Sequence, residues 1–207
     1  MRKRLTTILT LLALGGAVSG CTSISSNYTG AMTVPQKSRI VVCHGHNCTF
    51  KTNVELDAAA QKRFADIMAG GVKSAEAERA AISTADQYYE ELAFAAIGIR
   101  DEPQSGFSTS GQRGQMDCID ESTNTRSLLR YLEARGLLKY NTVQSNVSRG
   151  VLFDGRYPHS TAVIRDKATG IDWVVDSWYS KMGGAPDIFY LKDWLPRGFM
   201  QSGKVSS

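Results

Sequence analysis

The stretch HSTAVIRDKATGIDWVVD, residues 159–176, decides how the carboxyl-terminal half of the chain folds. Two apolar runs, 159–164 and 171–176, flank a turn-like hexapeptide that ends in glycine. This pattern predicts two strands joined as a β-hairpin. In a hairpin the start of the first strand lies beside the end of the second. We therefore expect His159 and Asp176 to be neighbours.

A second acid on the same hairpin, Asp172, competes with Asp176 for this place. Strand side chains alternate between the two faces, so both acids lie on one face and Trp173 lies on the other. Asp172 is nearer the turn, where solvation is easier. Asp176 is therefore the expected partner of the histidine.

A cysteine precedes the hairpin in QMDCIDES, residues 115–122, where a Gly/Ser-rich loop gives way to a helical pattern. In chain order, Cys118, His159 and Asp176 supply a thiol, an imidazole and a carboxylate. These are the parts of a cysteine nucleophile, its base and the group that orients the base. Of three histidines, His44 and His46 lie together near the amino end, which leaves His159 as the other candidate base.

The sequence around Cys118 contains features that lower the pKa of its thiol and others that raise it. A helix amino terminus and an imidazolium lower the pKa of a thiol. Asp117, Asp120 and Glu121 disfavour the thiolate unless they point away, although acids in a first helical turn also complement the helix dipole. An acyl-transfer site needs an oxyanion hole as well. The Cys118 backbone N–H and a side-chain amide of Gln112 or Gln115 are the candidate donors.

The amino end has the pattern of an export signal. Residues 1–4 are basic, and residues 5–18 form an apolar stretch too short to span a bilayer comfortably. The sequence VSGC, residues 18–21, resembles the lipobox of bacterial lipoproteins, although a plain small-residue cleavage site is the alternative. The resemblance implies a signal peptide at 1–20 and an acylated Cys21. With Thr22 next, it implies an outer-membrane anchor that faces the periplasm.

Beyond the signal we expect a flexible tether at 21–36, one domain at 37–200 and a disordered tail at 201–207. Cleavage would remove Arg2, Lys3 and Arg4 and no acid, which lowers the formal net charge from +4 to +1. The basicity belongs mostly to the signal, so the charge does not favour a nucleic-acid partner. The expected membrane link is the lipid on Cys21.

The pairing of the other cysteines decides whether Cys118 is free to act as a nucleophile. Cys43 and Cys48 are five residues apart around a glycine, and in an oxidising compartment a disulfide between them would leave Cys118 as the odd thiol. Cys118 bonded to either of them is the alternative. The run CHGHNC, residues 43–48, also carries ligand types suited to zinc or copper. Adjacent ligands on one tight loop cannot easily face one ion, so the disulfide is favoured and no metal is expected.

Helical spacing of apolar residues predicts helices over 56–67, from Ser74 through 76–94, and over 121–138. Short strands are expected at 38–43 and 151–153, and residues 188–195 suit either a strand or a short helix. Residues 101–115 should form a long exposed loop. Helices followed by antiparallel strands indicate an α+β fold.

Three segments together resemble the transglutaminase-like branch of the papain-like fold, with the bacterial transglutaminase-like cysteine proteinases as the nearest group. They are Cys118-Ile119-Asp120, His159 with the 173–176 run WVVD, and the 191–195 run LKDWL. The likeness covers roughly residues 114–195. Met116-Asp117 before the cysteine and Ser160 after the histidine depart from the family pattern.

This resemblance implies a papain/transglutaminase-like core in which the Cys-bearing helix packs on an antiparallel sheet. It also implies thiol-dependent hydrolysis of a peptide or amide without a cofactor. Cys118 would attack, His159 would move the proton and Asp176 would orient the imidazole. Two alternatives stay open: a non-catalytic binding or scaffold lipoprotein of the same fold, and a metal-binding envelope module centred on His44 and His46.

Overall fold

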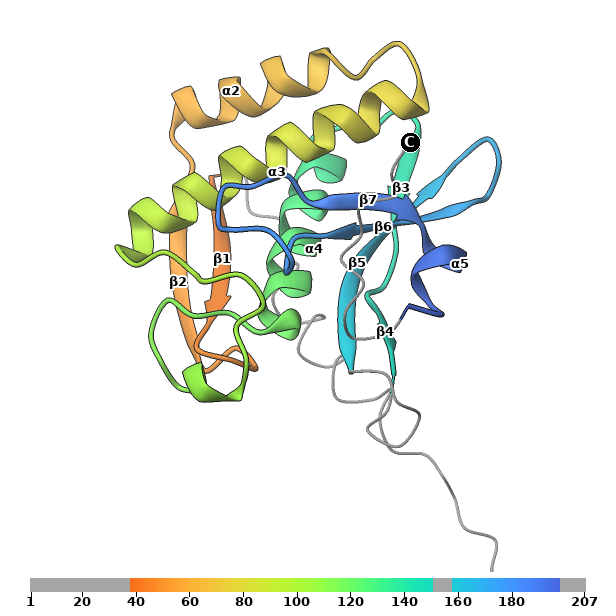
Figure 1. Cartoon of the computed structure of the whole chain (residues 1–207). Helices are drawn as coiled ribbons and strands as arrows, with labels where there is room; N and C mark the ends of the chain where they lie inside the picture. The colour runs from red at the N-terminus through yellow and green to blue at the C-terminus, as the bar shows by residue number, and fades with distance from the viewer. Residues whose placement is uncertain (1–37, 151–157, 198–207) are drawn as a thin grey trace, which may run out of the picture.

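The computed structural model describes residues 38–150 and 158–197, and over these ranges the fold is α+β (Figure 1). The helices are α2 (Ala58–Ala69), α3 (Ala75–Ile97), α4 (Cys118–Ala134) and α5 (Leu191–Trp194), with a 3₁₀ turn η1 (Phe107–Thr109). The strands are β1 (Arg39–His44), β2 (Phe50–Glu55), β3 (Asn141–Val143), β4 (Val147–Arg149), β5 (His159–Asp166), β6 (Asp172–Asp176) and β7 (Asp187–Tyr190).

Five of the strands form one antiparallel sheet. β5 pairs with β6, β6 pairs with β7, and the short β3 and β4 pair with successive parts of the other edge of β5. The β5–β6 register aligns Ala162 with Val175 and Arg165 with Asp172, which confirms the predicted hairpin. β5 is buried along nearly its whole length, so it forms the centre of the sheet.

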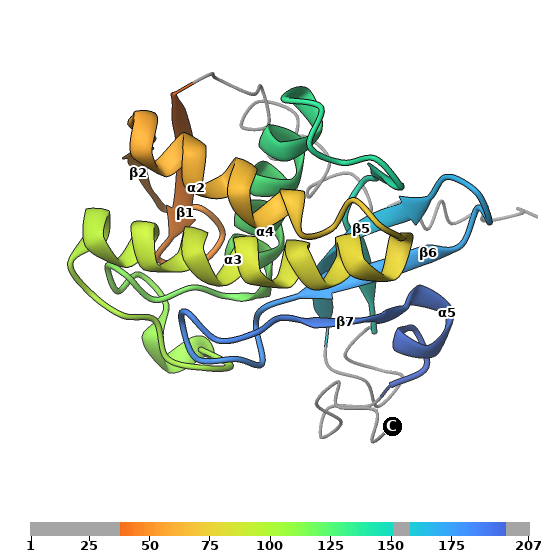
Figure 2. The same ribbon diagram turned by 90° about the horizontal axis from the view of Figure 1, so that it is seen from above.

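Helix α4 lies between this sheet and the separate β1–β2 hairpin, and it contacts β5 and β1 (Figure 1). Its leucines at 128, 129 and 132 are fully buried and join the main hydrophobic core. The paired helices α2 and α3 run alongside one another over α4 (Figure 2). Burial of these apolar faces is the main stabilising contribution.

The helix ends predicted from the sequence are correct for α3 and wrong for α4. Ser74 caps α3 by accepting the Ala77 N–H, and Gly98 ends it in the left-handed conformation. The predicted 121–138 helix instead spans Cys118–Ala134, because the Asp117 side chain accepts two N–H groups of its first turn. Gly136, with φ of 69°, turns the chain just after it.

Three strands, β2, β3 and β4, escaped the sequence analysis. β3 and β4 have three residues each, too few for a strand periodicity to emerge. The strand expected at 151–153 lies outside the described residues. Residues 188–195, expected to form either a strand or a short helix, contain both, because β7 runs directly into α5.

The segment 101–115, predicted to be an exposed loop, is exposed only in part. The side chains of Asp101, Ser105 and Gln115 are buried and hydrogen-bonded to one another or to nearby backbone. The expected signal peptide, the tether with Cys21 and the tail lie outside the described residues. Among the helices that the structure describes, none is long and apolar enough to cross a membrane.

Candidate functional site: Cys118, His159 and Asp176

The first turn of α4 positions Cys118. Asp117 has extended backbone angles and its Oδ1 accepts the N–H groups of Ile119 and Asp120 at 3.1 and 2.8 Å. This is the geometry of an N-cap, which fixes where the helix begins. Cys118 is therefore the first helical residue, at the positive end of the helix dipole.

The Cys118 sulfur lies against the start of β5. Its thiol donates to the Pro158 carbonyl with an Sγ···O distance of 3.9 Å, and the backbone N–H of Ser160 hydrogen-bonds to the sulfur. Burial, with a smaller contribution from Asp117 and Asp176, raises the pKa of the Cys118 thiol to about 12 despite the Ser160 N–H. At neutral pH the resting group is the neutral thiol.

His159 and Asp176 lie side by side at the open end of the β5–β6 hairpin. His159 Nε2 and Asp176 Oδ2 are 2.7 Å apart, and the two side chains are 1% and 2% exposed. The other ring nitrogen, Nδ1, is buried and has no hydrogen-bond partner within the described ranges. The pairing with Asp176 makes Nε2 the protonated nitrogen and leaves a lone pair on Nδ1.

Asp172, the competing acid, lies elsewhere. It forms a two-point ion pair with Arg165 across the hairpin, with N···O distances of 2.7 and 2.9 Å. That pair is partly exposed to solvent. The side chain of Asp172 is thus committed to a surface interaction and does not contact the histidine.

Aromatic rings enclose the imidazole. The rings of Trp178, Tyr179 and Trp194 have centroids 4.7, 5.2 and 5.4 Å from that of His159. The Trp194 indole N–H also donates to Asp176 Oδ2 at 2.8 Å. The sequence analysis assigned no function to Trp194. It had only the likeness of the 191–195 segment as a signal.

Two of the acids flanking Cys118 have structural partners away from the sulfur. Asp120 is fully buried and accepts the backbone N–H groups of Cys48 and His46 at 2.5 and 2.8 Å. Glu121 is buried on the opposite side and accepts the Ser177 hydroxyl at 2.8 Å. Burial raises the pKa of Asp120 to about 8, so this group contributes little negative charge at neutral pH.

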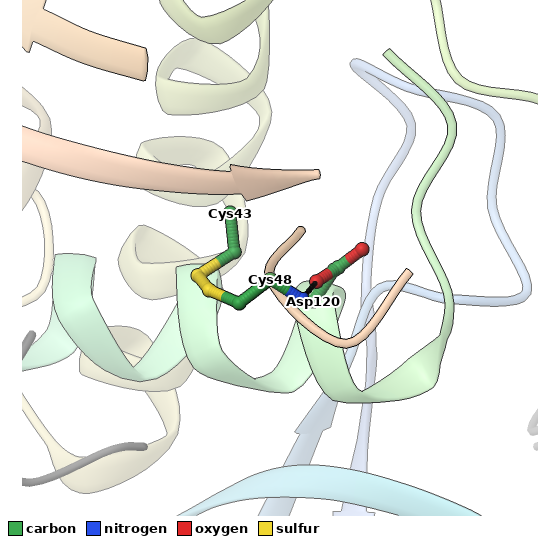
Figure 3. A group of neighbouring side chains, drawn as sticks. All are labelled: Cys43, Cys48 and Asp120. Atoms are coloured by element: carbon green, nitrogen blue, oxygen red, sulfur yellow. Dashed lines mark hydrogen bonds between the residues drawn. A yellow bond between two sulfur atoms is a disulfide. The ribbon is translucent and has the colours of Figure 1, made fainter. Parts of the chain in front are cut away.

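The segment 43–48 closes over the amino end of α4 through a disulfide. Cys43 and Cys48 are bonded, as predicted, and the Cys48 N–H donates to Asp120 of α4 (Figure 3). Among the described residues, Cys118 is the free cysteine. The Cys43 and Cys48 sulfurs and an Asp120 oxygen lie within 4.8 Å of one another, but the S–S bond occupies both sulfurs.

The two histidines of the rival metal hypothesis also have other partners. His44 Nδ1 accepts the Gly114 N–H at 3.2 Å, and its Nε2 lies 2.9 Å from the Thr52 hydroxyl. His46 Nε2 lies 3.1 Å from the Thr109 hydroxyl. These contacts tie the disulfide loop to the segment that precedes Cys118. They give both histidines a structural role.

Replacing both cysteines in Cys43→Ser/Cys48→Ser should lower the free energy of unfolding by about 2 kcal/mol, since a loop this short restricts the unfolded chain only modestly. Urea unfolding of the wild-type and doubly substituted proteins measures the difference. Dithiothreitol should bring the wild type to the midpoint of the variant and leave the variant unchanged. Equal midpoints for the oxidised wild type and the variant would contradict the prediction.

The two glutamines considered for the oxyanion hole use their amide groups within their own loop. Gln115 Nε2 donates to the Arg100 carbonyl at 3.1 Å, and its Oε1 accepts the Ser105 hydroxyl at 2.9 Å. Gln112 Nε2 donates to the Ser108 carbonyl. Neither amide hydrogen-bonds to Cys118 in the described part of the chain. The Cys118 backbone N–H remains a candidate donor.

Beneath α4 lies a group of buried carboxyl groups that the sequence did not indicate. A cavity of about 10 Å³, roughly the size of one water, is lined by Asp86, Glu90 and Glu121. Neither Asp86 oxygen meets hydrogen-bond geometry with any partner in the described ranges. The nearby Thr125 hydroxyl is instead 3.1 Å from Ser177 Oγ. Burial raises the pKa of Asp86 to about 7 and that of Glu121 well above its usual value.

Comparison of the chain with protein-family models, with curated proteins and with solved structures found no match. The chain is an α+β protein in which helix α4 packs on a five-stranded antiparallel sheet. A cysteine at the start of that helix lies beside a buried His–Asp pair on the sheet.

Proposed function

We propose that this protein is a cysteine hydrolase of the peptidase or amidase type with a papain/transglutaminase-like core. Cys118 is the nucleophile, His159 the base and Asp176 the residue that orients the base. The observation that supports this most is the 2.7 Å contact between His159 Nε2 and Asp176 Oδ2. It leaves Nδ1 of a buried ring without a hydrogen bond to Cys118 or to any other group in the described residues, while the Cys118 thiol contacts the carbonyl of Pro158, the residue before His159.

The reaction follows the general course of a cysteine nucleophile with a paired histidine. The thiol proton passes to His159 Nδ1 while the sulfur attacks the carbonyl carbon of the substrate. The imidazolium gives that proton to the leaving nitrogen as the C–N bond breaks, which leaves a thioester. Water then attacks the thioester with His159 as base, which yields a carboxylic acid and restores the thiol.

The raised pKa of the Cys118 thiol supports transfer of the proton in the same step as attack, rather than a thiolate that exists beforehand. The same observation favours a second candidate, a non-catalytic binding or scaffold protein that keeps the fold. A thiol that stays neutral is inert unless its base takes the proton. The two candidates therefore differ in whether His159 assists Cys118.

We further propose the setting in which this chemistry occurs. The lipobox-like 18–21 segment supports a protein attached to the bacterial outer membrane by a lipid on Cys21, with its domain in the periplasm. The substrate is then a peptide or protein of the cell envelope. Water exceeds any amine acceptor there, so hydrolysis is favoured over cross-linking.

Reaction of the non-reduced full chain with iodoacetamide tests the enzyme proposal. We expect Cys118 to be alkylated at pH 7 and His159→Gln to slow this reaction about 30-fold, because the base is lost. His46→Gln is the matched control and should leave the rate unchanged, since it removes an imidazole from the 43–48 loop and the glutamine amide can still hydrogen-bond to Thr109. Peptide mass mapping locates the label, and it also tests the anchor, because an acylated Cys21 carries lipid and no label.

Two outcomes would overturn the enzyme proposal. One is a Cys118 that stays unlabelled while the protein is folded. The other is equal labelling rates in the wild type and His159→Gln. Either result would favour the binding or scaffold protein.

A further inference from the structure

We propose that Trp194 is a positioning residue of this site: its indole N–H holds the Asp176 carboxylate in the orientation that presents His159 to Cys118. This inference rests on the proposed function and extends it. It concerns a residue 76 positions beyond the nucleophile, at the end of the short helix α5, which packs against β6 and β7.

The geometry converges on one oxygen atom. Asp176 Oδ2 accepts both the His159 Nε2–H at 2.7 Å and the Trp194 Nε1–H at 2.8 Å. All three side chains are at most 2% exposed, so water cannot substitute for either donor. Two donors on one oxygen define the plane and direction of the carboxylate, because a hydrogen bond weakens steeply away from linearity.

Arg149 in turn holds Trp194. Its guanidinium carbon lies 4.2 Å from the centre of the Trp194 ring, and its Nη1 donates to the Trp194 carbonyl. Its Nη2 donates to the Tyr179 hydroxyl at 3.1 Å. β4 pairs Arg149 directly opposite His159. One buried cation therefore connects the strand beside the histidine with the tryptophan beneath the aspartate.

The ring of Trp194 also contacts the imidazole, so its two roles can be separated. The indole N–H bonds to Asp176, whereas the ring face fills space beside His159. A phenyl ring keeps most of the second role and loses the first. With one donor fewer, the carboxylate is less oriented and more basic, and a more basic partner stabilises the imidazolium.

The pH dependence of Cys118 alkylation reports on this interaction. The titratable and charged groups facing the His159–Asp176 pair come from several elements and are Cys118 of α4, Arg149 of β4, Tyr179, Asp187 of β7 and Arg197. Trp194→Phe removes none of these groups and keeps an aromatic ring beside the Arg149 guanidinium. A shift in the profile therefore arises from the lost indole N–H.

We expect Trp194→Phe to slow iodoacetamide alkylation of Cys118 about tenfold at pH 7, the effect of losing one hydrogen bond to a charged acceptor. The limb of the pH–rate profile that follows imidazole titration should move to higher pH. Trp173→Phe is the matched control. Trp173 lies on the same hairpin, and its indole N–H has no partner in the described residues. That substitution should leave both the rate and the profile unchanged.

A double-mutant cycle with Asp176→Asn separates positioning from general destabilisation. If Trp194 acts through the carboxylate, Trp194→Phe should have almost no further effect in the Asp176→Asn background. Rates are compared at a temperature where circular dichroism shows every variant to be folded. An unchanged pH profile in Trp194→Phe, or a full tenfold loss in both backgrounds, would overturn the inference. His159→Gln tests the enzyme proposal separately, because its result does not depend on Trp194.

Discussion

Glu78→Ala is expected to lower the free energy of unfolding by about 4 kcal/mol, a large share of the stability of a domain of this size. Glu78 lies in the first turn of α3 and is 1% exposed. Its carboxylate accepts the backbone N–H groups of Lys139, Tyr140 and Asn141 at 2.5, 3.0 and 2.9 Å. It also accepts the Asn141 side-chain amide at 3.0 Å.

The cause of this loss is the set of donors left behind. Alanine would remove the acceptor for several N–H groups at once, and a buried donor without a partner costs more than the net value of its bond. These donors lie where the chain leaves α4 and enters β3. The substitution should therefore loosen the junction between the α2–α3 pair and the sheet.

Glu76→Ala is the matched control, because it removes the same charge from the same helical turn at an exposed position. Its effect should stay below about 1 kcal/mol, the usual contribution of a charge near a helix amino terminus. Urea unfolding followed by circular dichroism measures both variants. If Glu78→Ala does not fold, Glu78→Gln can be measured instead. It keeps one acceptor oxygen, so its free energy of unfolding should fall by about half as much. Equal stabilities of the Glu78→Ala and Glu76→Ala variants would contradict the prediction.

Asp86→Asn is expected to stabilise the protein above neutral pH by up to about 4 kcal/mol and to have little effect near pH 4. Asp86 is 1% exposed and lines the small cavity beneath α4. Burial raises its pKa from 3.8 to about 7, so the folded protein keeps a proton that the unfolded chain releases near pH 4. The amide has the shape of the protonated acid and does not ionise.

The sign of the pH dependence follows from the raised pKa. The protonated Asp86 makes its full contribution to stability below pH 4, where both states hold the proton. As the pH rises from about 4 to about 7, the unfolded state gains from ionisation and this contribution is progressively lost. The wild type should therefore lose stability over this range, and Asp86→Asn should lose less.

Melting temperatures measured from pH 4 to pH 8 test this difference. Asp193→Asn is the matched control, since Asp193 is exposed on α5 and its replacement should shift melting by the same small amount at each pH. Glu90 and Glu121 remain as buried carboxyl groups in Asp86→Asn, so some loss with rising pH should persist. If the difference in melting temperature between Asp86→Asn and the wild type does not widen as the pH rises, the explanation is refuted.

The parts of the fold that short sequence signals encode were predicted well. The β5–β6 hairpin follows from two β-branched runs and a turn, and the start of α3 follows from the Ser74 cap. The Cys43–Cys48 bond follows from a spacing of five and a glycine between. In each case the residues in contact are close in the sequence, so local propensity and geometry suffice. The roles of Cys118 and His159 in chemistry stay predictions.

The features that the sequence analysis missed depend on distant partners. Nothing near Glu78 indicates that its carboxylate binds the backbone around residue 140, and no motif links Trp194 to Asp176. The segment 101–115 looks polar and exposed, yet Asp101 is buried because Met116 and Ser105 satisfy its carboxylate. Burial of a polar group is decided by its partners, and periodicity does not reveal them.

The sequence by itself thus determined the α+β class, the hairpin that sets His159 beside Asp176 and the pairing that leaves Cys118 as a free thiol. The tertiary structure alone decided which groups act on that trio. It turned Asp120 away into the disulfide loop, enclosed the histidine in three aromatic rings and placed a second donor on the aspartate. The physical reason is that a side chain's protonation state and orientation depend on its surroundings, and folding brings those surroundings together from the whole chain.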